Sequence, residues 1–162
     1  MIGLISDSHD HIGHLHKASA VFREWQAELL VHAGDMISPG AMRLFPEKNL
    51  AAVFGNNDGE RHGLLQLFHA RGWRLQGDFL ELTLDGKRMA VYHGTIAAMR
   101  EALIDSGRYD YVVSGHTHQP ERRVIGTTLA LNPGTAHGFG GVATVMLLDT
   151  HDDSVEIIDL GR

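Results

Sequence analysis

Five short polar motifs constrain the fold of this chain more than any other feature of its sequence. Each stands where an apolar segment gives way to a glycine-containing loop. The motifs are Asp7-Ser8-His9, Gly34-Asp35, Gly55-Asn56-Asn57-Asp58, His93-Gly94 and Gly115-His116-Thr117-His118. In α/β folds the carboxyl ends of the strands form one rim, and ligands bind there. The pattern therefore predicts that side chains far apart in the sequence converge on one site.

The residue types in these motifs suit metal ions. Carboxylates, amide oxygens and imidazoles together favour Mn²⁺, Fe, Zn²⁺ or Ni²⁺ over Ca²⁺. Asp7 and His9 are two positions apart, as are His116 and His118, so an extended backbone points both side chains of each pair the same way. Each motif taken alone is more often a turn or a chance match. Their occurrence together, in order, predicts a metal site.

Apolar periodicity predicts alternating strands and helices in the first half of the chain and hairpins in the second. Strands are expected over residues 1–6, 28–32, 49–54 and 109–114. Helices are expected over residues 13–26, 39–45, 64–71 and 96–106. Hairpins are expected over residues 79–92, 122–131 and 142–160, with a turn at 132–134. This order predicts an α/β sandwich of mixed sheets under helical layers, in one domain spanning residues 1–162.

The bulk composition excludes several classes of protein. With 162 residues and 43% hydrophobic residues, the chain suits one globular domain. No apolar run approaches the roughly 20 residues that span a bilayer, and the N-terminus resembles a strand rather than a signal peptide. The chain has no cysteine, so metal ligands must be nitrogen or oxygen and a cytoplasmic location is expected. The net charge of −6 disfavours a nucleic-acid polymer as partner but does not disfavour a small phosphate ester.

The five motifs, in this order, resemble those of the calcineurin-like metallophosphoesterase superfamily. The match covers most of the chain. The short length, the lack of a cap insertion and the Asn132-Pro133-Gly134-Thr135 segment look like the small single-domain phosphodiesterase branch, to which the retromer scaffold subunit also belongs. The resemblance implies a four-layer αββα sandwich and a site for two divalent transition metal ions, with Mn²⁺ the first choice and Fe, Zn²⁺ or Ni²⁺ the alternatives.

The resemblance also implies how the ligands divide between the two metals. One metal would be held by Asp7, His9, Asp35 and His118. The other would be held by Asp35, Asn56, His93 and His116, so that Asp35 bridges them. Two cations about 3.5–4 Å apart clamp the attacking and leaving oxygens of an in-line displacement at phosphorus. Water shared between them loses a proton more easily and attacks as hydroxide, so no protein nucleophile is needed.

One position departs from the family pattern. Many relatives carry a histidine after the metal-binding asparagine, as a proton donor, whereas this chain carries Asn57. An amide donates a hydrogen bond but is no general acid near neutral pH. His11 is the nearest alternative donor, although a solvated loop histidine is the commoner explanation for it. Asp58 is expected to orient a neighbouring group or to close the turn.

Four further histidines have an open role at this stage. His32 is expected to be either a partner of the metal ligands or a hydrogen-bonded core residue. His14 and His16 are expected on the surface of the first helix. His137 lies in a glycine-rich loop, residues 134–141, that could border the substrate.

Two other functions compete with the phosphodiesterase hypothesis. A non-catalytic interaction module would keep the fold without a competent site, but all seven ligand positions here carry competent side chains. A nuclease acting on polymers is disfavoured by the net charge and by the lack of a basic patch with interleaved aromatics. Trp25 and the final hairpins could also support a homo-oligomer.

Overall fold

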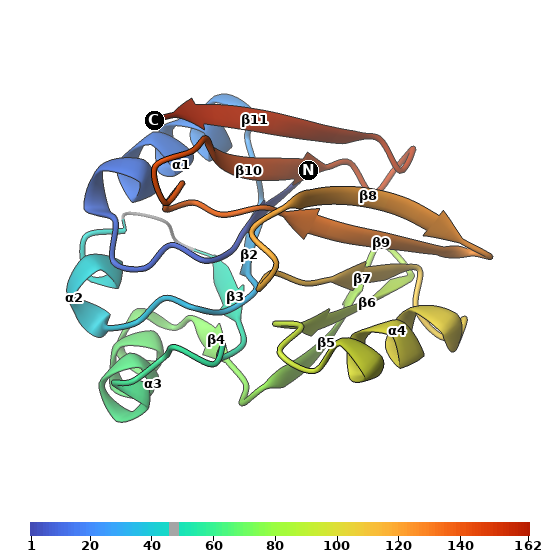
Figure 1. Cartoon of the computed structure of the whole chain (residues 1–162), viewed down its shortest axis with the longest axis horizontal. Coiled ribbons are helices and arrows are strands. Elements are labelled where there is room, and N and C mark those ends of the chain that lie inside the picture. The colour runs from blue at the N-terminus through green and yellow to red at the C-terminus, as the bar shows by residue number, and fades with distance from the viewer. Residues whose placement is uncertain (46–48) are drawn as a thin grey trace.

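The computed structural model describes residues 1–45 and 49–162, whose strands form two mixed sheets (Figure 1). The first sheet has the order β11-β10-β1-β2-β3-β4 and the second the order β5-β6-β7-β9-β8. The first contains β1 (Ile2–Ile5), β2 (Leu29–His32), β3 (Leu50–Ala52), β4 (Arg74–Leu75), β10 (Ala143–Leu148) and β11 (Val155–Gly161). The second contains β5 (Phe79–Leu84), β6 (Lys87–Tyr92), β7 (Tyr111–Val113), β8 (Pro120–Ile125) and β9 (Thr128–Pro133). Strands β1 to β4 are parallel, as are β6, β7 and β9.

Helices cover the outer face of each sheet, so the layers run helix, sheet, sheet, helix. The first sheet is covered by α1 (Ile12–Glu24), α2 (Pro39–Met42) and α3 (Arg61–Arg71), and the second by α4 (Ala97–Asp105). A central apolar cluster joins the inner faces of the two sheets, and two further clusters lie under the helices. This architecture confirms the predicted αββα sandwich.

The alternation of side chains along β1 shows how the sequence builds these layers. Leu4 points into the cluster between the sheets, whereas the next residue, Ile5, points into the cluster beneath the helices. Gly3 lies where α1 comes closest to the sheet. A Cβ atom at that position would lie 2.5 Å from the Phe22 ring and 2.6 Å from a Leu30 methyl carbon. Only glycine therefore lets α1 pack this closely on the strand.

Apart from shifts of one or two residues at the ends of elements, the observed elements differ from the predicted ones in four places. Strand β4 was not predicted, because two residues carry no periodicity. Helix α3 begins three residues earlier than expected, and α2 ends at Met42 rather than at residue 45. The turn expected at residues 132–134 is wrong for its first two positions, because β9 continues to Pro133, which pairs with Pro120. The chain turns at Gly134, where φ is +83°.

No helix in the described part of the chain is long and apolar enough to cross a membrane.

Candidate metal centre

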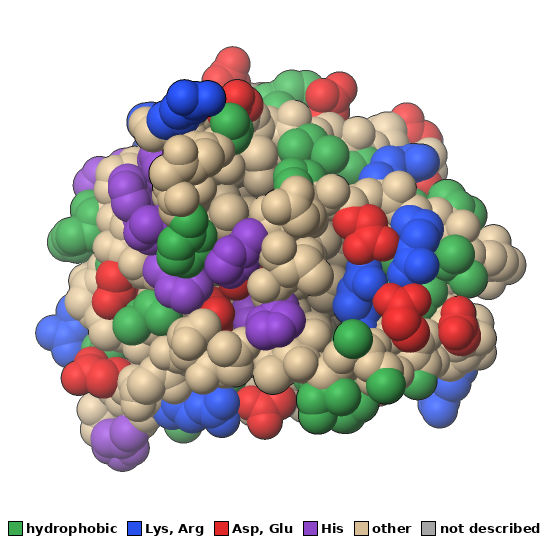
Figure 2. All heavy atoms as spheres, viewed as in Figure 1, with side chains coloured by type: hydrophobic (Ala, Val, Ile, Leu, Met, Phe, Trp, Pro, Cys, Tyr) green, Lys and Arg blue, Asp and Glu red, His purple; other side chains and the backbone are tan. Residues whose placement is uncertain are grey.

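The loops that follow five strands meet on one face of the molecule. The five predicted motifs follow β1, β2, β3, β6 and β7, and their loops run between the ends of the two sheets. Figure 2 shows histidine side chains gathered there, with carboxylates set deeper between them. The structure therefore brings together motifs that are as much as 109 positions apart, since the His116 N–H donates to Asp7 Oδ2 at 3.0 Å.

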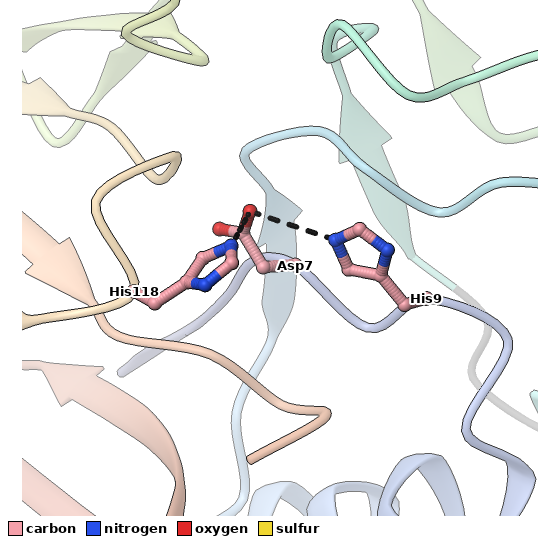
Figure 3. Close-up of side chains that lie close together, drawn as sticks. All are labelled: Asp7, His9 and His118. Carbon is pink, nitrogen blue, oxygen red and sulfur yellow. Dashed lines mark ion pairs between the residues drawn. The ribbon is translucent and has the colours of Figure 1, made fainter. Parts of the chain in front are cut away.

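Asp7 lies at the bottom of this centre and is fully buried. Its Oδ2 atom accepts hydrogen bonds from the Ser6 hydroxyl and from the His116 amide. Its Oδ1 atom has no hydrogen-bond partner among the described residues, although His118 Nε2 lies 3.2 Å away and His9 Nε2 4.0 Å away (Figure 3). Burial raises the pKa of the Asp7 carboxyl above its ordinary value. An orphaned, buried carboxylate oxygen facing imidazole nitrogens is typical of a cation site.

Asp35 lies between two imidazole rings. Its Oδ2 atom is 3.4 Å from His9 Nε2 and 3.4 Å from His93 Nε2. Both carboxylate oxygens also accept hydrogen bonds from Asn57, one from the amide side chain and one from the backbone N–H, each at 2.8 Å. Burial raises the pKa of Asp35, but the neighbouring His9 and His93 rings and the hydrogen bonds from Asn57 outweigh it and hold the pKa well below its usual range.

The tautomer of His93 is set by the backbone. Its Nδ1 atom donates to the Ala33 carbonyl oxygen at 2.7 Å, which leaves the lone pair of the neutral ring on Nε2. That Nε2 atom lies 3.1 Å from Asn56 Oδ1 and 3.4 Å from Asp35 Oδ2. Two acceptors this close to a lone pair require a proton or a metal ion among them. Burial alone would lower the pKa of His93, but the neighbouring Asp35 and Asp7 carboxylates raise it by more than burial lowers it. The ring therefore binds a proton more tightly than a free histidine.

The backbone is strained at five of the seven predicted ligands. Asp7, His9, Asp35, His116 and His118 all have φ between +41° and +68°. Residues other than glycine rarely adopt this left-handed conformation, and such strain clusters at functional sites.

Two glycines in the motifs are required by close approach to the carboxylates. A Cβ atom at Gly55 would lie 2.1 Å from Asp35 Oδ1, and one at Gly115 would lie 2.5 Å from Asp7 Oδ2. Their absent side chains let two loops pass directly against the acidic groups.

Asp58 and His32 hold the loops rather than face the open centre. The Asp58 carboxylate accepts three backbone hydrogen bonds, from Asp35 and Gly55 at Oδ2 and from Ile37 at Oδ1. His32 is fully buried, and its Nδ1 accepts from the Gly34 N–H, so its Nε2–H donates to the Ser8 hydroxyl. Burial lowers the pKa of His32 to about 3. The structure thus makes His32 a neutral core residue that joins the loops after β1 and β2.

The histidines near α1 do not all lie where the sequence placed them. His14 is buried, so its predicted surface position is wrong, whereas His16 is exposed as expected. His14 Nδ1 donates to the carbonyl oxygens of Ala136 and His137, contacts more than 120 positions away that periodicity does not reveal. His11 caps α1 through its Nδ1 atom, which accepts from the His14 N–H, and its ring stacks on that of His14.

A loop that the sequence left undecided borders the centre. The ring of Phe139 stacks on His118 with 4.6 Å between the ring centroids and meets the ring of His9 edge-on at 4.8 Å. His137 lies beside His9 and His11. Phe139 was not predicted as a site residue. The only hint in the sequence was a large apolar residue among glycines.

The donor atoms fall into two overlapping sets. Within each set the atoms lie within 4.8 Å of one another: one contains Asp7, His9 and His118, and the other contains Asp7, Asp35 and His93. Asp7 belongs to both sets, whereas the expected division placed it with one metal only. Asp35 lies equally close to a histidine of each set, as a bridging carboxylate would. His116 is in neither set, although its ring centroid lies 5.2 Å from that of His93.

These residues fit divalent transition metal ions. The donors are carboxylate oxygens, an amide oxygen and imidazole nitrogens, and both Asp7 Oδ1 and His9 Nε2 are buried without a hydrogen-bond partner among the described residues. A cation would satisfy both atoms at once.

Comparison with known proteins agrees with this geometry. The sequence profile of the calcineurin-like phosphoesterase superfamily domain matches residues 1–153. A phosphodiesterase of Methanocaldococcus jannaschii is 35% identical over 153 residues, which are 92% of each chain. The solved structure of an archaeal phosphodiesterase superposes with a TM-score of 0.92 at 32% identity, covering 98% of both chains.

More distant structures share the fold alone. The phosphoesterase YfcE from E. coli has a TM-score of 0.69 at 21% identity, over 99% of each chain. Zn²⁺-bound Vps29 from Entamoeba histolytica has a TM-score of 0.60 at 17% identity, also over 99% of each chain.

Proposed function

Because the chain belongs to the calcineurin-like phosphoesterase superfamily, we propose that it is a metal-dependent phosphodiesterase acting on a small phosphodiester. One observation carries the proposal: Asp7 Oδ1 is buried, without a hydrogen-bond partner among the described residues, and faces the nitrogens of three histidines. The residues that would hold two divalent ions are Asp7, His9, Asp35, Asn56, His93, His116 and His118. Mn²⁺ is our first choice, with Fe, Zn²⁺ and Ni²⁺ as alternatives.

Bound metals would polarise the phosphoryl oxygens and lower the pKa of water near phosphorus. The protein's own part is to hold the donors in place. The Ala33 carbonyl fixes the His93 tautomer, and the Asp58 carboxylate joins the Asp35 loop to the Gly55 loop. We therefore assign Asp58 a positioning role rather than a catalytic one.

The residues of this site account for the attack on phosphorus, but they do not provide an evident proton donor for the leaving group. The Asn57 side chain is turned toward Asp35, and His11 is engaged as the cap of α1. With no protein acid assigned to the leaving oxygen, hydrolysis should favour acidic leaving groups. A series of aryl phosphodiesters with rising leaving-group pKa should therefore show steeply falling rates, and a flat dependence would contradict this part of the proposal.

The activity is tested by loading the purified protein with each metal in turn and measuring hydrolysis of bis-aryl and mono-aryl phosphates. Asp35→Asn serves as the matched variant, since the amide keeps the shape of the side chain and removes its charge. We expect the metal-loaded wild type to hydrolyse the diester far faster than the variant. Equal rates would favour the non-catalytic interaction module instead.

The presence of Vps29 among the structural neighbours keeps that second function in view, although a likeness of 17% identity shows the fold alone. The complete donor set favours the enzyme. A cytoplasmic location and self-association stay predictions.

A further inference from the structure

Two adjoining cavities lead away from the metal centre between β6 and α4. The nearer has a volume of about 300 Å³, and Asn56 and Thr95 lie in its wall. The farther has a volume of about 440 Å³. Asp78, Tyr92 and Met99 line both, so the two form one continuous groove, here called the α4 groove. Each volume falls in or near the range of small-molecule sites, roughly 300–1,000 Å³.

The near end of the α4 groove opens on the metal donors. Asn56 Oδ1 lies 3.1 Å from His93 Nε2 and 3.4 Å from the Thr95 hydroxyl. A phosphoryl group held at the metal centre would therefore have one of its ester oxygens at the entrance of the groove.

The middle of the groove is polar, and its main polar group is the Arg61 guanidinium, which has three neighbours. The Arg61 guanidinium lies over the Phe54 ring at 4.7 Å, donates to the Gly55 carbonyl oxygen at 3.2 Å and pairs with Asp78 at 3.2 Å. These three contacts fix a cation beside the path from the metals. The Arg61–Asp78 pair offers both donors and acceptors to the polar part of a ligand.

The far end is almost wholly apolar. Its wall consists of the Phe79 and Tyr92 rings, Met99, Ala102 and Leu103, with Asp78 at the junction. Met99 is 52% exposed, and its neighbour Ile96 on the rim of the nearer cavity is 53% exposed. Large apolar side chains gathered around an open cavity indicate a binding site, and aromatic rings with a thioether suit a flat aromatic ligand.

We propose that the α4 groove binds one ester substituent of the phosphodiester, and that this substituent carries an aromatic ring joined to phosphorus through a short polar or flexible spacer. The order of residues along the groove supports this assignment: the metal donors come first, the Arg61–Asp78 ion pair next and the apolar pocket last. The proposal rests on the proposed function, because it takes the metal centre as the place where phosphorus binds. It narrows the substrate class to diesters with an aromatic substituent.

A series of phosphonates measures this directly. The Mn²⁺-loaded protein is titrated by calorimetry with methylphosphonate, then with phosphonates that carry a phenyl ring on spacers of zero to three methylene groups. At the spacer length that reaches the apolar end, affinity should rise at least about tenfold over methylphosphonate, the scale expected for moving an aromatic ring from water into an apolar site.

Two alanines on α4 provide a matched pair of variants. Ala102 is exposed and lines the apolar end, so Ala102→Phe should fill the pocket and remove the gain in affinity. Ala98 is exposed on the same helix and is not among the residues that line either cavity, so Ala98→Phe should keep the gain. A gain that survives Ala102→Phe, or no gain at any spacer length, would overturn the proposal.

A second measurement separates the groove from the metal chemistry. In metal-free protein, 3-phenylpropanol should shift the NMR signal of the Met99 methyl group, and Ala102→Phe should abolish that shift. Failure of methylphosphonate to bind the metal-loaded protein would overturn the proposed function. A missing Met99 shift would overturn the aromatic site even where methylphosphonate binds.

Discussion

Two charged regions of this protein, the candidate metal centre and an ion-pair group between α4 and the edge strand β8, are built in opposite ways. In the ion-pair group formed by Arg100, Glu101, Glu121 and Arg123, every guanidinium faces a carboxylate. Arg100 pairs with Glu101 at 2.6 Å and with Glu121, while Arg123 pairs with the same two carboxylates at 2.8 and 2.9 Å. Two positive and two negative side chains balance one another there.

The metal centre lacks that balance. Its two buried carboxylates, Asp7 and Asp35, face imidazoles, which carry no charge in their neutral form. Its backbone is strained at five of the predicted ligands, whereas none of the four members of the ion-pair group has a positive φ. This is the difference we expect if the ion pairs stabilise the fold and the strained, buried charges of the candidate metal centre bind a ligand.

The largest expected effect comes from removing the buried charge of the metal centre. Asp7→Asn should lower kcat/KM of the metal-loaded enzyme by at least about 10³-fold, several kcal/mol of transition-state stabilisation. The unfolding free energy of the metal-free protein should stay equal or rise, because the charge that is removed is buried and one of its oxygens has no hydrogen-bond partner in the described part of the chain. Steady-state kinetics and chemical unfolding in EDTA measure the two effects. If the variant kept its activity but unfolded more easily, Asp7 would stabilise the fold as the ion pairs do, and the contrast between the two regions would be wrong.

The ion-pair group should respond in the opposite way. Arg100 is nearly buried and also donates to the Ser114 hydroxyl, so Arg100→Met removes the donor to Ser114 and leaves Glu121 paired with Arg123 alone. We expect a loss of about 3 kcal/mol of unfolding free energy. The control, Arg123→Met, removes a more exposed guanidinium and should cost below about 1 kcal/mol. Urea unfolding of both variants checks this, and equal losses would show that burial does not set the cost.

Protonation of His32 should weaken the fold at acid pH. Its pKa is about 3 in the folded protein against 6.5 for the free side chain, so the unfolded chain binds one more proton between these values. Stability is therefore complete above pH 6.5 and falls as the pH drops, by about 2 kcal/mol between pH 6.5 and 4.5 for one group. Unfolding of metal-free wild type and His32→Gln as a function of pH measures it. We expect the slope of unfolding free energy against pH to be smaller in the variant, by the amount that corresponds to one bound proton. Identical slopes for the two proteins would refute the prediction.

A smaller effect than that of His32 is expected at Asp58, which lies beside the candidate metal centre but has its charge satisfied by backbone N–H groups. Asp58→Asn should cost about 1–2 kcal/mol of unfolding free energy, because an amide has one acceptor oxygen where the carboxylate has two, so at least one of the three backbone N–H groups loses its acceptor. The metal affinity should fall only through looser positioning of Asp35. A loss of metal binding as large as that of Asp7→Asn would instead make Asp58 a ligand.

The sequence predicted the parts of this molecule that depend on local order. Asp7, Asp35 and His93 could be placed because each follows an apolar strand, and the ends of parallel strands share a rim. The same reasoning predicted both sheets, but it missed β4, whose two residues pair without a pattern of their own.

Features that depend on contacts between residues far apart in the sequence could not be predicted from local patterns. His14 is buried because residues 136 and 137 fold over α1, and Phe139 reaches His118 through the same loop. The place of Asp7 in both donor sets, rather than one, also arises from the packing of the two sheets against each other.

The number of metal ions bound per chain tests the central claim most directly. Metal-free protein titrated with Mn²⁺ in a calorimeter, with elemental analysis of the dialysed product, should bind two ions per chain in the wild type. Asp7→Asn and Asp35→Asn should each bind fewer than two, while Arg100→Met should still bind two. A wild type that binds no more metal than Asp7→Asn would contradict the account.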